Sequence, residues 1–182
     1  VFAERVTKAR QLATGPIGAN LFAPQPSAGT PAAIEAYAAS LAPEAERYGA
    51  APGSPRFDDD AWAAKLDVLL DLRPEVASFT FGVPSADECR KLRDAGIVTV
   101  GTVTTLAEAQ AAVGAGIDVL AAQGPSAGGH RGRFDPSAQP ASEPLEQLLA
   151  AMRAAVDVPV IAAGGLSTSG DIRRVMQGGA VA

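Results

Sequence analysis

The fold is decided by Ile97-Val-Thr-Val-Gly-Thr-Val103 followed by Thr105-Leu-Ala-Glu108. The β-branched residues of the first run predict a strand. Thr105 with a glutamate three positions later is the capping-box pattern that opens a helix. That helix is expected to end at Gly114 or Gly116, because glycine closes a helix in the left-handed conformation. A strand followed so tightly by a helix is typical of a βα unit in a parallel sheet.

The same unit recurs on both sides at a spacing of about 20 residues, which suits tight βα connections. Further strands are expected at Val76–Gly82, Ile117–Gln123 and Val158–Ala163, with another beginning at Ala180–Ala182. Further helices are expected at Ser85–Asp94, which also opens with a capping box, around Leu145–Val156, and at Ser169–Met176. We therefore predict an α/β fold.

The N-terminal part is less regular. It predicts a helix at Phe2–Ala13, a strand at Pro16–Phe22, a helix near Ala32–Tyr48 and another around Asp60–Leu72. The run Asp58-Asp-Asp60 resembles a metal-binding cluster, but it precedes a helix, where carboxylates cap free backbone N–H groups. We expect no metal site there.

Composition limits the classes of protein. The chain has 182 residues, 47% of them hydrophobic, which is enough for one core and one domain over residues 1–182. A net charge of −5 argues against nucleic acid as a partner. No apolar run is long enough for a membrane span and no leader opens the chain, so a cytoplasmic location is the simplest expectation. The single cysteine, Cys89, is expected to be a structural thiol.

The order of elements predicts a TIM (β/α)8-type barrel. Five complete βα units and the start of a sixth are fewer than the eight of such a barrel, so we expect the barrel to be incomplete at both ends of this chain. An open, doubly wound sheet is the alternative architecture, since local periodicity does not reveal closure. The sequence leaves open whether the chain forms homo-oligomers.

In a (β/α) barrel the active site gathers at the C-terminal ends of the strands. Those positions are Asn20, Gly82, Thr102, Gln123, the loop Gly124–Arg133, and Gly164-Gly165. Small residues let the backbone approach a ligand, and the helix that opens at Ser167–Ser169 would favour an anion. A phosphate-bearing cofactor fits this pattern.

The loop Gln123-Gly-Pro-Ser-Ala-Gly-Gly-His-Arg-Gly132 contains the only histidine of the chain, His130. Imidazole exchanges protons readily near neutral pH, so His130 is the candidate for proton transfer. A Schiff-base aldolase is disfavoured because Lys8, Lys65 and Lys91 all lie in predicted helices. A metal hydrolase is disfavoured because one histidine with scattered carboxylates supplies no set of ligands.

The loop at residues 122–132, together with Pro159-Val-Ile-Ala-Ala-Gly-Gly165, resembles the nitronate monooxygenase family, formerly called 2-nitropropane dioxygenases. The resemblance extends over nearly the whole chain and includes Pro16-Ile-Gly-Ala-Asn-Leu-Phe22 and Val100-Gly-Thr-Val103. It implies an FMN-binding TIM barrel. It also implies oxidation of alkyl nitronates, and in some members of neutral nitroalkanes, by O2 to a carbonyl compound and nitrite.

Carried over by position, the resemblance implies that Asn20, Gln123, Gly128, and Gly164 or Gly165 contact FMN. It further implies that His130 is the catalytic residue, which removes the α-proton of a nitroalkane or holds the nitro group.

Arg131 either adds positive potential for an anionic substrate or forms a structural ion pair, for which Asp135 is a candidate partner. An N-terminal strand with a Pro-Met stretch and a later strand with a Gly-Thr phosphate contact, both part of the family pattern, have no counterpart in these residues. An FMN-dependent enoyl-ACP reductase is the nearest rival, and Arg131, where that family has isoleucine, favours the monooxygenase. A truncated, non-catalytic barrel fragment is the alternative from another class.

Overall fold

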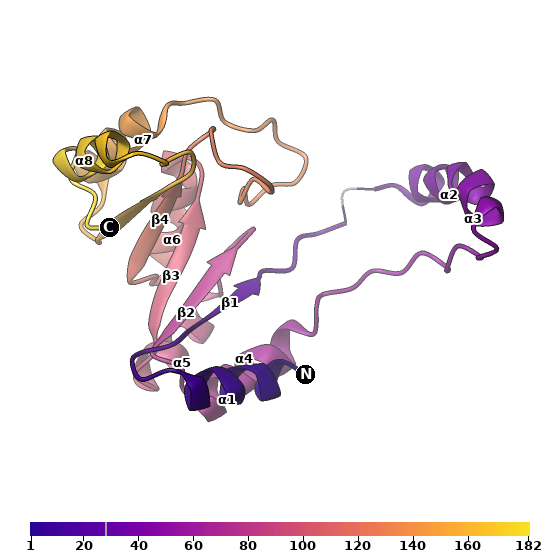
Figure 1. Ribbon diagram of the computed structural model, residues 1–182, viewed down its shortest axis with the longest axis horizontal. Helices are drawn as coiled ribbons and strands as arrows, with labels where there is room; N and C mark the ends of the chain where they lie inside the picture. The colour runs from indigo at the N-terminus through magenta and orange to yellow at the C-terminus, as the bar shows by residue number, and fades with distance from the viewer. Residues whose placement is uncertain (28) are drawn as a thin grey trace.

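Figure 1 shows the architecture of the computed structural model, which describes residues 1–27 and 29–182. The strands are β1 (Gly18–Phe22), β2 (Val76–Thr80), β3 (Val98–Val103), β4 (Val119–Gln123) and β5 (Val160–Ala163). The helices are α1 (Phe2–Leu12), α2 (Pro31–Ser40), α3 (Ala42–Arg47), α4 (Trp62–Leu72), α5 (Ala86–Asp94), α6 (Leu106–Ala115), α7 (Leu145–Ala155) and α8 (Ser169–Gln177). The predicted α/β class is confirmed.

The five strands form one sheet in the order β1-β2-β3-β4-β5, with every neighbouring pair parallel. Strands that follow one another in chain order, with helices packed between them, form the wall of a (β/α) barrel. A doubly wound sheet would reverse the strand order, so that alternative is wrong. Residues 180–182, predicted to begin a further strand, are not assigned to one, but they bind to the edge of β5. Val181 donates its N–H to Val160 O (2.9 Å), and Ala162 donates to Ala182 O (2.8 Å).

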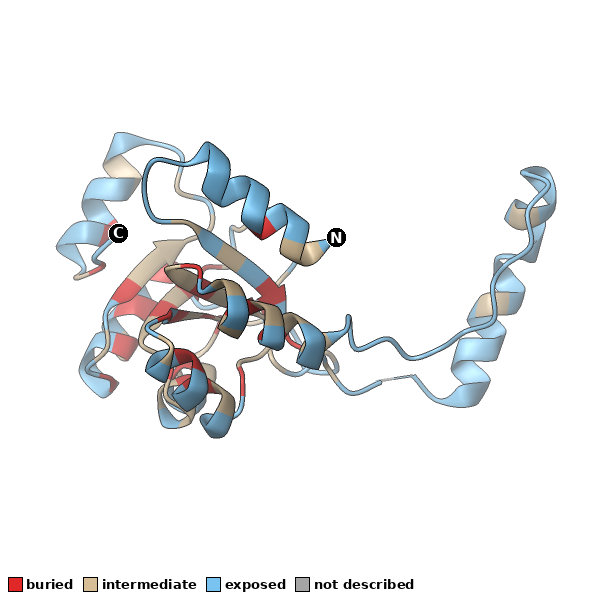
Figure 2. Cartoon of the chain, turned by 90° about the horizontal axis from the view of Figure 1, so that it is seen from below, coloured by how far each residue is buried: buried red, intermediate tan, exposed pale blue. Residues whose placement is uncertain are grey.

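The core lies between the sheet and its helices, as the buried residues in Figure 2 show. Alternate strand residues point into it, among them Phe79 and Leu120, which are fully buried. Helices α5, α6 and α7 contribute Leu92, Ala109 and Leu148 from the other side. Burying a side chain of leucine or phenylalanine size stabilises a fold by about 1.5–3 kcal/mol. Because the helices cover one face of the sheet, the opposite face is available for a functional site.

Four strands, β1, β3, β4 and β5, begin one or two residues later than the sequence predicts. For β3 and β4 the reason is that Ile97 and Ile117 close the preceding helices. Ile97 donates its N–H to Leu92 O (3.0 Å) and Ile117 donates to Ala112 O (3.1 Å). The glycines before them, Gly96 and Gly116, have φ of 79° and 98°. This geometry is a glycine-terminated helix end, and it places the end of α6 at the second of the two predicted glycines.

Residues 24–27 and 29–60 follow β1 and form an arm that extends away from the sheet (Figure 1). The helix predicted at Ala32–Tyr48 is divided into α2 and α3 at Leu41. Pro43 explains the break, because proline lacks the N–H that a continuous helix would need there. The predicted helix-capping role of the aspartates is wrong. Asp58 and Asp59 accept from the N–H groups of Asp60 and Ala61, in the turn before α4.

No helix among the described residues is both long and apolar enough to cross a lipid bilayer. Those residues also contain no group of three or more His, Cys, Asp or Glu side chains that could hold a metal ion. Cys89 is buried on α5 and free, as predicted. Burial raises the pKa of its thiol to about 11. The lysine residues lie on α1, α4 and α5, away from the strand ends where a Schiff-base site would need them.

Candidate active site

The predicted site residues gather at the C-terminal edge of the sheet. Asn20 lies in β1, Gln123 ends β4, and Gly164 follows β5. His130 lies in the connection between β4 and α7, residues 124–144. Strand residues on the face that the helices do not cover carry hydroxyl groups. The part of the site formed by the sheet is therefore polar.

Asn20 is the centre of a small polar cluster on that uncovered face. Ser78 and Thr80 of the neighbouring strand donate their hydroxyls to Asn20 Oδ1 (2.9 and 3.3 Å). Both bonds orient the amide, and they leave its N–H groups as donors for a ligand above the sheet. The sequence did not single out the two hydroxyl residues. The parallel register, which sets Asn20 opposite Ser78, brings them together.

Gln123 binds the loop that carries His130. Its Nε2 donates to His130 O (3.2 Å), and its Oε1 accepts from the N–H of Gly132 (2.8 Å). One side chain thus fixes the backbone on both sides of Arg131. Contact between Gln123 and FMN stays a prediction, since both ends of its amide are engaged with protein in this structure.

The imidazole of His130 lies at the surface, against an aromatic pair. Its ring meets Phe81 edge to face, with centroids 5.8 Å apart and planes at 72°. Phe81 also packs on Phe22, at 5.1 Å. Phe81 has φ of 71°, a conformation that non-glycine residues seldom adopt. Such backbone is frequent at functional sites, and here it directs the ring that supports His130.

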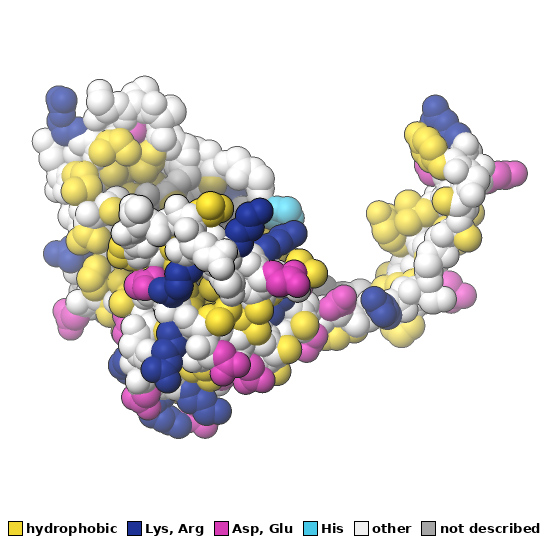
Figure 3. All heavy atoms as spheres, turned by 60° about the horizontal axis from the view of Figure 1, so that its bottom comes forward, with side chains coloured by type: hydrophobic (Ala, Val, Ile, Leu, Met, Phe, Trp, Pro, Cys, Tyr) yellow, Lys and Arg dark blue, Asp and Glu magenta, His cyan; other side chains and the backbone are white. Residues whose placement is uncertain are grey.

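Two arginines accompany His130 in a hollow of about 270 Å³, whose lining is Gln25, Phe81, His130, Arg131, Arg133, Pro136 and Pro140. The lining contains no carboxylate, so its net charge is positive. Figure 3 shows basic side chains beside the single histidine at the molecular surface. A larger hollow of about 620 Å³ lies on the arm and contains none of the predicted site residues.

The ion pair proposed between Arg131 and Asp135 is wrong. Arg131 instead donates to the carbonyl of Ala141 (3.2 Å), and its Nε is buried with no hydrogen-bond partner among the described residues. Asp135 accepts from the hydroxyl and N–H of Ser137 (2.6 and 2.8 Å), and these bonds hold the pKa of its carboxyl below the ordinary value. Three-residue turns of this kind satisfy aspartate locally and compete with a longer-range pair.

Gly132, the last residue of the glycine-rich motif, allows the loop to contact the sheet closely. A Cβ at this position would lie 2.9 Å from Thr102 Cγ2 and 3.3 Å from Thr80 Cγ2. Glycine therefore lets the His130 loop rest directly on the side chains of β2 and β3. A glycine two residues after the histidine indicates a close contact of the backbone, but the sequence does not reveal that the contact is with β2 and β3.

The predicted glycines after β5 allow a second close approach. A Cβ on Gly165 would lie 2.5 Å from Ser126 Cβ, and one on Gly164 would lie 2.9 Å from Ala127 Cβ. Both glycines have positive φ, 99° at Gly164 and 75° at Gly165. In contrast, nothing lies within 4 Å of a Cβ placed on Gly128. Gly128 therefore has open space beside its backbone.

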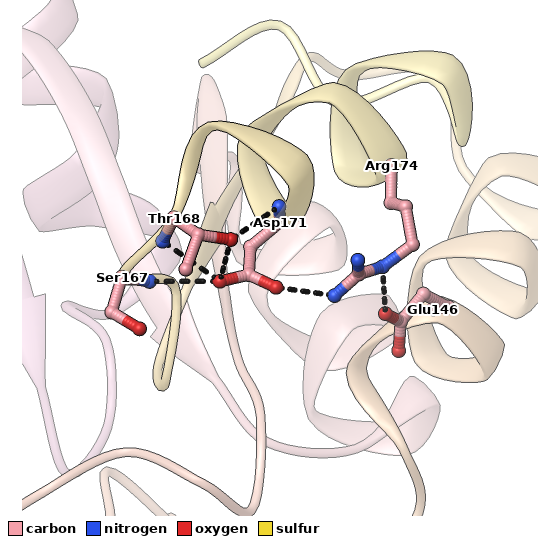
Figure 4. A network of polar contacts seen from close by, with 5 residues as sticks. All are labelled: Glu146, Ser167, Thr168, Asp171 and Arg174. Carbon is pink, nitrogen blue, oxygen red and sulfur yellow. Dashed lines mark hydrogen bonds and ion pairs between the residues drawn. The ribbon is translucent and has the colours of Figure 1, made fainter.

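The start of α8, for which an anion was expected, already holds the chain's own carboxylate (Figure 4). Asp171 accepts from the hydroxyl and N–H of Thr168 and from the N–H of Ser167. These bonds, with Arg174 beside them, hold the pKa of Asp171 far below its ordinary value. Arg174 also pairs with Glu146 of α7 (3.7 Å). The network joins two helices at the rim of the site.

A model of the nitronate monooxygenase family matches residues 1–182, the whole chain. A nitronate monooxygenase from Paraburkholderia phytofirmans is 36% identical over 97% of this chain and 50% of its own length. A crystal structure of nitroalkane oxidase from Streptomyces ansochromogenes is 43% identical, with a TM-score of 0.89 over 97% of this chain and 51% of that one. A mutant of FabK from Thermotoga maritima, at 20% identity and a TM-score of 0.65 over 99% of this chain and 46% of that one, shares the fold. The chain thus spans about half the length of the relatives it matches.

Proposed function

Because the chain belongs to the nitronate monooxygenase family, we propose that it provides the active site of an oxidoreductase that oxidises alkyl nitronates with O2. FMN is the proposed cofactor, held by one domain that comprises residues 1–182. Neutral nitroalkanes are a second proposed substrate. The products would be a carbonyl compound and nitrite. For each nitronate the C–N bond breaks, carbon gains one oxygen atom and the nitro group leaves as nitrite, so that one O2 oxidises two nitronates in the overall balance.

One observation carries the proposal. His130 stands at the C-terminal edge of the sheet, in a cationic hollow with Arg131 and Arg133, and its loop rests on the polar strand face. Catalytic groups of barrel enzymes occupy this edge. Positive charge around the hollow favours a nitronate, which is an anion, and also the negative charge that develops as a nitroalkane loses its proton.

The residues present fit FMN. Asn20 offers amide N–H donors above the sheet, Gly128 leaves open space for a flat ring, and Gly164 and Gly165 present backbone in conformations that other residues rarely adopt. We propose these four positions, with Gln123 beside them, as the FMN contacts. When bound, FMN would supply the transfer of electrons between the substrate and dioxygen.

The chain's own residues would then manage charge and protons. The imidazole of His130 takes the α-proton from a neutral nitroalkane, or as a cation holds the nitro group of a nitronate. Arg131 adds positive potential from the same hollow. Phe81 supports the imidazole on one edge and reduces its contact with water. A nitronate needs no deprotonation, so the two substrates make different demands on His130.

A paired assay of the full-length protein tests this proposal. We expect FMN absorption bands in the purified or FMN-supplemented protein, and nitrite release from a nitronate under air. The same preparation should not reduce an enoyl thioester with a nicotinamide cofactor. Reduction of the thioester without nitrite release would assign the protein to the reductase chemistry instead, and absence of any flavin band would argue for a non-catalytic barrel.

A further inference from the structure

Three helices that follow strands carry an acidic residue at the same position, the third of the helix. On α5 and α8, Glu88 and Asp171 complete a reciprocal cap with the residue before the helix. On α6 the reciprocal cap predicted for Thr105 and Glu108 is wrong in one half. Thr105 does accept from the N–H of Glu108 (3.1 Å), but the Glu108 carboxylate turns elsewhere.

The two oxygens of Glu108 join the end of β3 to the segment that follows His130. Oε2 accepts from the N–H and the hydroxyl of Thr104 (2.6 and 2.8 Å), a residue that is only 3% exposed. Oε1 accepts from the N–H of Phe134 (2.8 Å). Since both oxygens face donors, a carboxylate is required there. An amide would place its NH2 group against one of those donors.

Side chains alone fix the segment from His130 to Phe134. In the described part of the chain, no backbone–backbone hydrogen bond involves residues 130–134. Gln123 binds the segment at His130 and Gly132, and Glu108 binds it at Phe134. Gln25, at the base of the arm, donates to the carbonyls of Arg133 and Phe134 (2.9 and 2.8 Å).

From this geometry we infer that Glu108 is a positioning residue of the His130 site. It does not touch the imidazole. It fixes the C-terminal end of the segment, four residues beyond His130, while Gln123 fixes the start. The inference rests on the function proposed for His130 in its kinetic part only, because the order of the segment is measurable without activity. Small misplacements of a reacting group can lower rates by up to about a hundredfold.

The test compares Glu108→Gln with Glu88→Gln in the full-length protein. Glu88 is a matched control, since its carboxylate also takes three donors: the N–H and hydroxyl of Ser85 (both 2.7 Å) and Trp62 Nε1 (3.2 Å). Neither partner belongs to the segment after His130. Hydrogen–deuterium exchange of the peptide that contains residues 130–134 is measured alongside nitroalkane and nitronate turnover.

The amide oxygen of Glu108→Gln should stay with Thr104, which offers two donors, so that the NH2 group faces the single N–H of Phe134. We therefore expect exchange in that peptide to be at least about tenfold faster, because the Phe134 N–H loses its acceptor. It should lower kcat/KM for the nitroalkane by roughly ten- to a hundredfold, with a smaller effect on the nitronate. Glu88→Gln should change neither quantity by more than about twofold. Equal effects of the two variants, or faster exchange with unchanged nitroalkane turnover while His130→Asn is inactive, would overturn the inference.

If Glu108→Gln does not fold, Glu108→Asp replaces it, since the shorter side chain keeps the charge at α6 but does not span both partners. The exchange and turnover results expected for Glu108→Gln then apply to Glu108→Asp. If His130→Asn itself leaves turnover unchanged, the proposed function fails, and the exchange measurement alone decides whether Glu108 orders the segment.

Discussion

Gly132→Ala tests the close contact between the His130 loop and the threonine side chains of β2 and β3. The new Cβ would lie 2.9 Å from Thr102 Cγ2, whereas carbon atoms in ordinary contact are about 3.5–4.0 Å apart. The loop must therefore rise by about 0.6 Å or more. A rise of that size would lengthen the bond from Gly132 N to Gln123 Oε1 from 2.8 Å to about 3.4 Å, beyond the usual range.

We expect Gly132→Ala to lower the free energy of unfolding by about 1–3 kcal/mol, as overpacking usually does. Nitroalkane kcat/KM should fall by roughly tenfold or more, because His130 moves with the loop. Thermal melts and steady-state kinetics of the full-length protein measure the two effects. Gly114→Ala is the control. Its Cβ meets nothing within 4 Å, and alanine favours the helix by up to about 1 kcal/mol.

The double variant Gly132→Ala with Thr102→Ser isolates the contact, since serine lacks the methyl group that the new Cβ meets. It should recover most of the lost stability and activity, and the recovery should exceed any effect of Thr102→Ser alone. The reasoning is refuted if Gly132→Ala keeps wild-type nitroalkane kinetics, or if the double variant is no better than Gly132→Ala.

The remaining predictions concern the stability and burial of the surrounding fold. Gly165→Ala should destabilise the fold by about 1–3 kcal/mol through its positive φ alone, and by more because its Cβ would meet Ser126 at 2.5 Å; chemical denaturation measures this. Cys89 should resist thiol reagents until the protein unfolds, because burial raises its pKa to about 11; labelling at pH 8 with and without denaturant tests this. Burial opposes ionisation of Asp118, but hydrogen bonds from Thr99 outweigh it and lower the pKa. That stabilisation is present above the unfolded value of about 3.9 and is lost as pH falls through the folded value, so Asp118→Asn should cost stability at pH 6 and progressively less below pH 4.

The repeating part of the fold was predictable because each βα unit carries its own local signals. Ser85 and Glu88 form the predicted cap, and Gly116 ends its helix in the left-handed conformation. The boundary errors at β3 and β4 also have a local cause, since Ile97 and Ile117 have strand-like side chains but their N–H groups bond to the preceding helix.

The site was predictable only in part. The glycine-rich motif predicted the position of His130, in the connection that follows β4, because one continuous stretch of sequence contains both. The catalytic role of His130 stays a prediction. The contacts of Gln25 and Glu108 with the loop were not predictable, because these residues lie 108 and 26 positions from the loop residues they bind. The second cap was misassigned because Thr104 and Thr105 both offer hydroxyls, and which of them binds Glu108 depends on the burial of Thr104 at the end of β3.

The most direct test of the central claim is His130→Asn in the full-length protein, with a neutral nitroalkane and its nitronate assayed separately. If His130 removes the α-proton, the nitroalkane rate should fall by about 10²–10⁴-fold, the usual contribution of a general base, while the nitronate rate falls far less. FMN absorption should be unchanged, because the imidazole is not among the proposed cofactor contacts. Wild-type activity toward the nitroalkane would remove His130 from the mechanism and contradict the account.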